Sequence, residues 1–183
     1  MKTIKLKKYF RIKEKNIIQK NLSLILTSTK TGKNISGGIE RYQKELQKSL
    51  SKYFTTETIE IAPPQGKMIN SYFGLKFFFL CAKKILFIKH SKLIICDPQI
   101  SMMTIAGLLI SRAKEKYVIS HGWMFHTRNH FYIKKIYFLF CRYFILPKFT
   151  KVVCVSKQDF DVCSDLSNKV LFENCMGIEA NVK

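Results

Sequence analysis

Three short motifs in this chain hold groups that could contact a ligand. Gly37-Gly38 precedes a segment with helical periodicity, while His121-Gly122 and Ser156 each follow an apolar run. Glycine lets the backbone approach a ligand closely, and free N–H groups at the start of a helix favour a phosphate. The glycine pair also fits a tight turn between a strand and a helix, and Ser156 fits a helix N-cap. The motifs alone therefore leave both a binding and a structural role open.

The histidine motif is the one that offers acid–base chemistry. The His121 imidazole could hydrogen-bond a substrate hydroxyl or transfer a proton, unless it is satisfied within its own loop. His126 and His130 follow at intervals of five and four residues, which is not a standard zinc spacing, and we expect no metal. Asp97 is the only carboxylate expected at the tip of a central strand. A pair of carboxylates for glycoside hydrolysis is therefore not expected.

The elements that must position these motifs alternate between strand and helix. We expect strands over 21–28, 56–61, 92–96, 116–120, 151–155 and 169–172, and helices over 39–53, 72–88, 100–113, 131–146 and 157–165. This alternation predicts an α/β fold with one Rossmann-like parallel sheet and helices on both of its faces. In such a sheet, ligands bind beyond the carboxyl ends of the strands, where all three motifs fall.

The composition of the chain excludes several classes of protein. The chain has 183 residues, a net charge of +20 and 47% hydrophobic residues, which excludes a disordered basic tail. Its longest stretch without a charged residue, 98–111, is shorter than the roughly 18 residues that a membrane span needs. The basic N-terminus has no apolar signal-peptide core, and the six cysteines form no C-x-x-C pair. We expect a cytoplasmic location and buried, reduced thiols.

Two expected helices, 72–88 and 131–146, carry more apolar surface than packing on a sheet requires. On a helical wheel, the cations of each helix fall on one side, and they are Lys76, Lys83 and Lys84 in the first and Lys134, Lys135 and Arg142 in the second. Aromatic side chains beside cations favour binding to an anionic membrane surface. Coverage by a neighbouring domain remains the alternative. We expect no nucleic acid, because its binders place exposed aromatics among polar residues.

Four segments in order resemble glycosyltransferase family 4. They read GGIERYQKELQKSLSK from Gly37, VISHGWMFHT from Val118, KVVCVSKQD from Lys151 and KVLFENCMGIE from Lys169. The pattern H-G-x-x-F-H-T is similar to that of bacterial mannosyl- and glucosyltransferases that build lipid-linked polysaccharide units. Together the segments extend the resemblance over residues 21–180.

The resemblance implies a GT-B fold, in which two Rossmann-like domains face each other across a cleft. This chain corresponds to the first, acceptor-side domain over 21–176, with a basic appendage at 1–20 and the start of the hinge at 177–183. The implied activity is transfer of a hexose from a nucleotide sugar to a lipid-linked or polysaccharide acceptor at the inner face of the cytoplasmic membrane, with no cofactor. The alternative is an inactive, truncated or split-partner module that binds acceptor at the membrane surface.

The family also implies roles for the motif residues. Gly37 and Gly38 would reach toward the donor pyrophosphate, His121 would lie near the transferred sugar, Ser156 would lie at the cleft, and His126 would position the acceptor or its loop. At the hinge, this chain departs from the family's usual Asn-Gly pair. Because the family's second domain binds most of the sugar nucleotide, we expect little activity from this chain alone.

Overall fold

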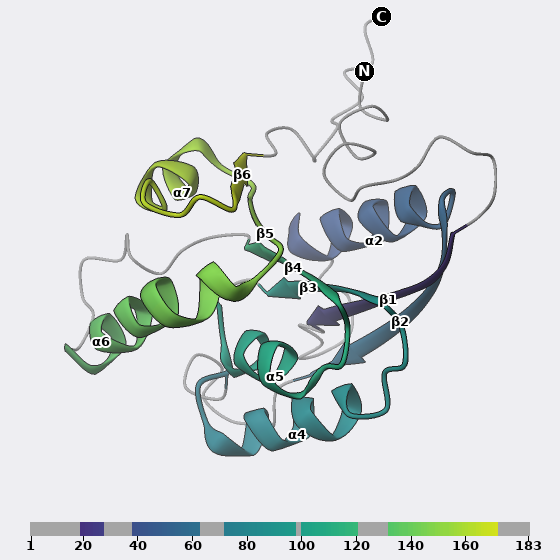
Figure 1. Cartoon of the computed structure of the whole chain (residues 1–183), viewed down its shortest axis with the longest axis horizontal. Coiled ribbons are helices and arrows are strands. Elements are labelled where there is room, and N and C mark those ends of the chain that lie inside the picture. Colours follow the sequence, from purple (N-terminus) through teal and green to yellow (C-terminus); the bar gives the residue numbers. More distant parts are fainter. Residues whose placement is uncertain (1–18, 28–37, 63–71, 98–99, 121–131, 172–183) are drawn as a thin grey trace, which may run out of the picture.

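The fold is an α/β, Rossmann-like arrangement built on a six-stranded, all-parallel sheet (Figure 1). The structure is a computed structural model that describes residues 19–27, 38–62, 72–97, 100–120 and 132–171. Within the sheet, the strand order is β2-β1-β3-β4-β5-β6. This arrangement confirms the fold class predicted from the alternating pattern of the sequence.

Each predicted strand and helix is present, with ends shifted by a few residues. The strands are β1 (Gln19–Thr27), β2 (Phe54–Ile61), β3 (Lys92–Asp97), β4 (Glu115–Ser120), β5 (Lys151–Cys154) and β6 (Lys169–Leu171). The helices are α2 (Gly38–Leu50), α4 (Leu75–Ile85), α5 (Met102–Ile110), α6 (Tyr132–Phe140) and α7 (Lys157–Val162), with a π-helical turn η2 (Cys141–Ile145) and a 3-10 turn η3 (Leu146–Lys148) after α6.

The direction of each crossover decides which face of the sheet a helix covers. The step from β1 to β2 runs opposite to every later step along the sheet, so right-handed connections send α2 to one face and α4, α5 and α6 to the other. The two apolar cores agree with this. One core joins Leu46 of α2 to Leu24 of β1, and the other joins Phe77 of α4 and Met103 of α5 to Ile25. Figure 1 shows α2 on the opposite side of the sheet from α4 and α5.

The helix predicted over 131–146 is not a regular α-helix to its end. It changes from α to π geometry at Cys141 and then to a 3-10 turn that contains Pro147. Proline has no N–H to donate, so an α-helical ladder cannot continue through it. Beyond Phe140, the α-helical wheel used for the sequence therefore no longer describes where side chains point.

The described cysteines are buried thiols. All five of them, Cys81, Cys96, Cys141, Cys154 and Cys163, are free and buried, which confirms that part of the prediction, while Cys175 lies outside the described residues. Burial raises the pKa of Cys81 and of Cys141 to about 12. Thiols with such pKa values hold almost no thiolate near neutral pH, so these cysteines serve packing and not nucleophilic chemistry.

Candidate functional site

The carboxyl ends of the parallel strands form one edge of the sheet, called here the carboxyl edge. The strand register aligns Asp97 of β3 with Ser120 of β4, and Ser120 with Cys154 of β5. The chain leaves the neighbouring strands β1 and β3 toward opposite sides, so a topological switch point lies between them, where open α/β sheets bind ligands. Gly38 begins α2 after β1, and Ser156 follows β5. Two of the predicted motif residues therefore lie on this edge.

Asp97 holds the start of α5 through one of its carboxylate oxygens. Its Oδ2 accepts hydrogen bonds from the Ser101 backbone N–H at 2.7 Å, the Ser101 hydroxyl at 2.9 Å and the Thr104 hydroxyl at 2.6 Å. The Ser101 hydroxyl in turn accepts a bond from the Met103 N–H. All of these side chains that bond Asp97 are buried. The Oδ2 atom thus accepts three hydrogen bonds that hold the start of α5, which leaves this oxygen no lone pair for acid–base chemistry.

A strained residue marks the turn between β3 and α5. Ile100 is buried and has a φ of 50°, a left-handed conformation that is an outlier for a β-branched residue. Its carbonyl accepts a hydrogen bond from the Tyr137 hydroxyl of α6 at 3.0 Å. Burial raises the pKa of Tyr137, so this hydroxyl remains a donor across the ordinary pH range. Strain of this kind concentrates at binding and switching sites, and here it lies at the carboxyl edge.

Ser120 is a functional candidate that the sequence analysis treated only as the end of a strand. Its hydroxyl oxygen is fully buried and has no hydrogen-bond partner among the described residues. A buried polar group without a partner costs about 1–3 kcal/mol, so a ligand that bonded it would recover that energy. The signal was present in the sequence as a serine that closes an apolar strand, KYVIS, directly before His121.

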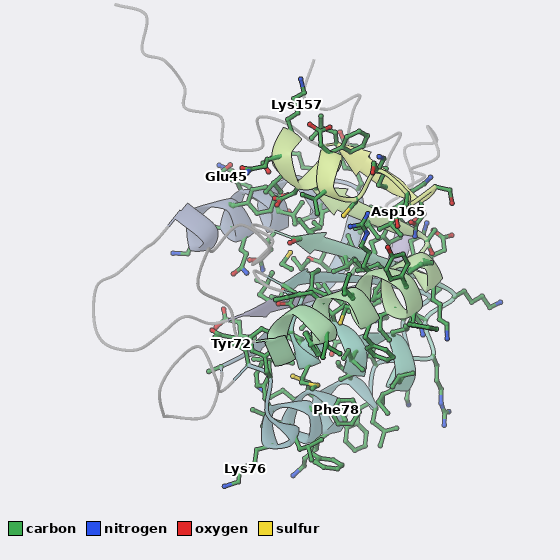
Figure 2. All side chains as sticks on the ribbon, turned by 90° about the vertical axis from the view of Figure 1, so that its left-hand side faces the viewer. Glu45, Tyr72, Lys76, Phe78, Lys157 and Asp165 are labelled. Carbon is green, nitrogen blue, oxygen red and sulfur yellow. The ribbon has the colours of Figure 1, made fainter. Side chains whose placement is uncertain are left out.

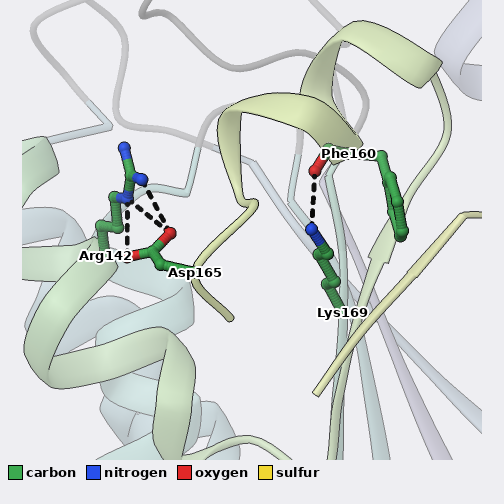
Figure 3. A network of polar contacts seen from close by, with 4 residues as sticks. All are labelled: Arg142, Phe160, Asp165 and Lys169. Carbon is green, nitrogen blue, oxygen red and sulfur yellow. Dashed lines mark hydrogen bonds and ion pairs between the residues drawn. The ribbon is translucent and has the colours of Figure 1, made fainter. Parts of the chain in front are cut away.

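Ser156 is the N-cap of α7, as the sequence predicted. Its hydroxyl accepts a hydrogen bond from the Asp159 N–H at 3.1 Å. The segment after Ser156 is held at two further points, shown in Figure 3. Arg142 of η2 forms an ion pair with Asp165 at 2.7 Å, and Lys169 of β6 lies 4.3 Å from the centre of the Phe160 ring. The position of Ser156 therefore depends on contacts from η2 and β6.

The structure describes only some of the predicted site residues. Gly37, His121 and His126 lie outside the described residues. Lys134 and Lys135 belong to α6, but their side chains are outside the described part. The proximity of His121 to Gly37-Gly38 and Ser156 thus stays a prediction.

The predicted cationic residues differ in their surroundings. Lys76 and Lys83 of α4 are exposed, and in Figure 2 Lys76 extends from α4 away from the rest of the protein. Lys84 is also exposed, but its Nζ donates a hydrogen bond to the Glu60 carbonyl at 2.7 Å. Arg142 has a partner within the chain. Its guanidinium donates three hydrogen bonds to the Asp165 carboxylate, so its charge is neutralised within the chain.

Large apolar side chains are exposed on the outer side of the helices that cover the second core. This surface, called here the helical face, comprises Leu75, Phe79, Leu80, Leu86 and Phe87 of α4 and its C-terminal turn, Leu109 of α5, and Ile136, Leu139, Phe140, Tyr143 and Phe144 of α6 and η2. None of the described helices is long and apolar enough to cross a membrane. The surplus apolar surface expected from the sequence is therefore present on short helices that pack on a sheet.

Comparisons with known proteins add no identification. No known family model matches the chain, and a search of curated proteins finds no match either. The resemblance to glycosyltransferase family 4 therefore rests on the four sequence segments alone.

Proposed function

We propose that this chain is the acceptor-side domain of a glycosyltransferase that moves a hexose from a nucleotide sugar to a lipid-linked or polysaccharide acceptor. One observation carries the proposal. The motif residues Gly38 and Ser156 lie at the starts of helices on the same carboxyl edge, which also contains the switch point between β1 and β3. This is the edge at which open α/β sheets bind nucleotides and sugars.

Hexose transfer would need groups from the carboxyl edge of this chain and further groups from a second domain. In hexose transfer, the bond between the anomeric carbon and the diphosphate breaks, and the acceptor hydroxyl bonds that carbon and loses its proton. Hydrogen-bond donors fixed around the leaving diphosphate stabilise its developing charge. Here the buried Ser120 hydroxyl has no hydrogen-bond partner among the described residues, whereas Oδ2 of Asp97 is committed to α5. A single domain cannot surround the diphosphate, so transfer requires a donor domain as well.

The experiment is a transfer assay with the chain supplied together with a family 4 donor domain in trans. Membranes that contain both are incubated with radiolabelled nucleotide hexoses, and label in the lipid-extractable fraction is counted. We expect transfer that depends on both polypeptides. A complemented chain that folds, binds its donor domain and transfers no hexose from any nucleotide would refute the proposal.

Ser120→Ala separates a ligand contact from a structural role. The variant removes a buried hydroxyl that has no partner among the described residues, so the free energy of unfolding should stay level or rise. If the hydroxyl contacts a ligand, kcat/KM should fall about three- to tenfold. Ser91→Ala, at an exposed position just before β3 and hence at the opposite edge, is the matched control and should leave transfer unchanged.

A second function is favoured by the helical face. An acceptor-binding module that lies on a membrane and transfers no sugar would also use exposed aromatic residues beside lysines. It would bind a lipid-linked saccharide but show no dependence of product on a nucleotide sugar, even with a donor domain present. The transfer assay therefore distinguishes the two functions.

A further inference from the structure

The aromatic and aliphatic side chains of the helical face are exposed as a group and not as isolated residues. Phe79 of α4 is 65% exposed, Phe87 in the turn after α4 is 73% exposed, and Phe144 of η2 is 61% exposed. The rings of Phe140 and Phe144 stack on each other at 5.5 Å. Contiguous exposed apolar patches on soluble domains mark sites of association with another surface.

Aromatic contacts join the part of the helical face on α4 to the part on α6. Phe73, in the turn before α4, packs edge-to-face on Tyr137 and Phe138 of α6. The neighbouring Tyr72 carbonyl accepts a hydrogen bond from the Met102 N–H at the start of α5. The amino ends of α4 and α5 thus meet, α6 contacts the turn before α4 through Tyr137 and Phe138, and the helices together cover the second core.

The charge on this layer has a single sign. The chain contains no Asp or Glu between Ile61 and Cys96 or between Lys116 and Gln158, and α5 contains none either. Two acids near this layer are paired within the chain, Glu115 with Lys92 at 3.0 Å and Asp165 with Arg142.

Basic side chains lie on the same elements as the exposed apolar residues. On α4, on η3 and in the turns that follow α4 and α5, the exposed basic residues are Lys76, Lys83, Lys84, Lys89, Arg112, Lys114 and Lys148. On the opposite side of the sheet, α2 instead mixes exposed Lys44 and Lys48 with exposed Glu45. The helical face is therefore both the apolar and the cationic side of the protein.

We propose that the helical face docks on the surface of an anionic lipid bilayer, with Phe79, Phe87 and Phe144 entering the headgroup region and Lys76 and Lys83 contacting anionic headgroups. Aromatic rings partition into the interface, and each lysine near an anionic membrane adds electrostatic attraction. Arg142 takes no part, because Asp165 already neutralises it. This inference concerns the helices and not the carboxyl edge, so it holds or fails independently of sugar transfer.

Charge complementarity selects a bilayer over a second copy of the chain. A symmetric dimer through this face would bring two positively charged surfaces together, because the helices of the face contain no Asp or Glu. Like charges brought together in an interface cost several kcal/mol of association energy. An anionic bilayer instead supplies the missing negative charge over the whole face.

The test is co-sedimentation of the chain with vesicles of phosphatidylcholine alone or with about one third phosphatidylglycerol. We expect binding to the anionic vesicles that weakens as salt is raised, because salt screens the headgroup attraction. Lys76→Gln with Lys83→Gln should lower the partition coefficient about 30-fold, at about fivefold for each lysine. Phe79→Ser with Phe87→Ser should lower it about tenfold, and because both side chains are exposed, the melting temperature should change little.

The matched control is Lys44→Gln with Lys48→Gln on α2, which removes the same charge from the opposite face. This control should keep nearly all of the vesicle binding. Loss of binding equal to that of the Lys76 and Lys83 pair would overturn the assignment of the face, since it would show that only net charge matters. Equal, salt-insensitive binding to neutral vesicles would overturn the role of the lysines. Self-association in ultracentrifugation that the two phenylalanine substitutions abolish, without vesicle binding, would replace the bilayer by a second copy.

Discussion

The role of Asp97 can be decided by removing its three hydrogen bonds. Asp97→Ala leaves the Ser101 N–H, the Ser101 hydroxyl and the Thr104 hydroxyl buried without their acceptor. Hydrogen bonds to a charged group contribute about 1.5–3 kcal/mol each, but bonds within one network do not add fully, so we expect a loss of about 4 kcal/mol. That is a large part of the about 5–15 kcal/mol by which a domain is stable, and it corresponds to a fall of roughly 10 °C in Tm.

Graded variants keep this prediction measurable if Asp97→Ala fails to fold. Thr104→Val keeps the shape of the side chain, removes the 2.6 Å bond alone and should cost about 1.5–2 kcal/mol in urea unfolding. Asp97→Asn retains one acceptor oxygen, so its loss of stability should lie between those of Thr104→Val and Asp97→Ala. The reasoning would be refuted by an Asp97→Ala protein whose Tm lies within about 2 °C of the parent. If such a protein also lost transfer in the complemented assay, Asp97 would be a reacting group and not a cap.

Three further measurements test the packing, the ion pair and the division of labour. A Cβ at Gly107 of α5 would lie 2.1 Å from Ile95 Cδ1, so Gly107→Ala should destabilise the fold by about 1–2 kcal/mol in urea unfolding despite alanine's better helix propensity, and Ile95→Val, which removes that atom, should relieve part of the loss. The hydrogen bond from Arg142 lowers the pKa of Asp165, so the stability from this pair is present above the unfolded carboxyl pKa and lost as the pH falls through the lowered folded value. Because the pair is partly exposed, Arg142→Gln should cost at most about 1 kcal/mol at neutral pH, and its melting curve should rejoin that of the parent in acid. Calorimetric titration of a nucleotide sugar into this chain alone should give weak binding at most, and tight saturable binding would contradict the proposed need for a donor domain.

The order of strands and helices was predictable because it depends on local patterns. Runs such as KLIIC and KVVCV are apolar on both sides, which is typical of strands covered on both faces, and their alternation with helical segments leaves few topologies open. The cap at Ser156 was predictable for the same reason, since an N-cap bonds a residue only three positions ahead.

Features that depend on distant partners were not predictable. Arg142 was expected at a membrane surface because no acid lies near it in sequence, yet Asp165, 23 residues later, folds back to pair with it. In addition, Arg142 lies in the π-helical turn that begins at Cys141, so an α-helical wheel does not describe where its side chain points. Asp97 was recognised as a carboxylate at a strand tip, but its hydroxyl partners are set by how α5 begins. The sequence marks Ser120 as the polar end of an apolar strand, but whether its hydroxyl finds a partner among the described residues depends on the fold.

The two proposals together fix the path of a lipid-anchored acceptor. The helices α4, α5 and α6 follow β2, β3 and β4, so each begins at the carboxyl edge, and the helical face and this edge share a border. With 11 residues at a rise of about 1.5 Å, α4 is roughly 16 Å long. A saccharide whose lipid remains in the bilayer therefore has no more than about one helix length to reach the edge. It follows that substitutions at Phe79 and Phe87 should raise KM for a lipid-linked acceptor held in vesicles while leaving KM for a soluble acceptor analogue unchanged. An equal rise for both acceptors would show that these residues act on the fold and not on the approach of the lipid-linked acceptor.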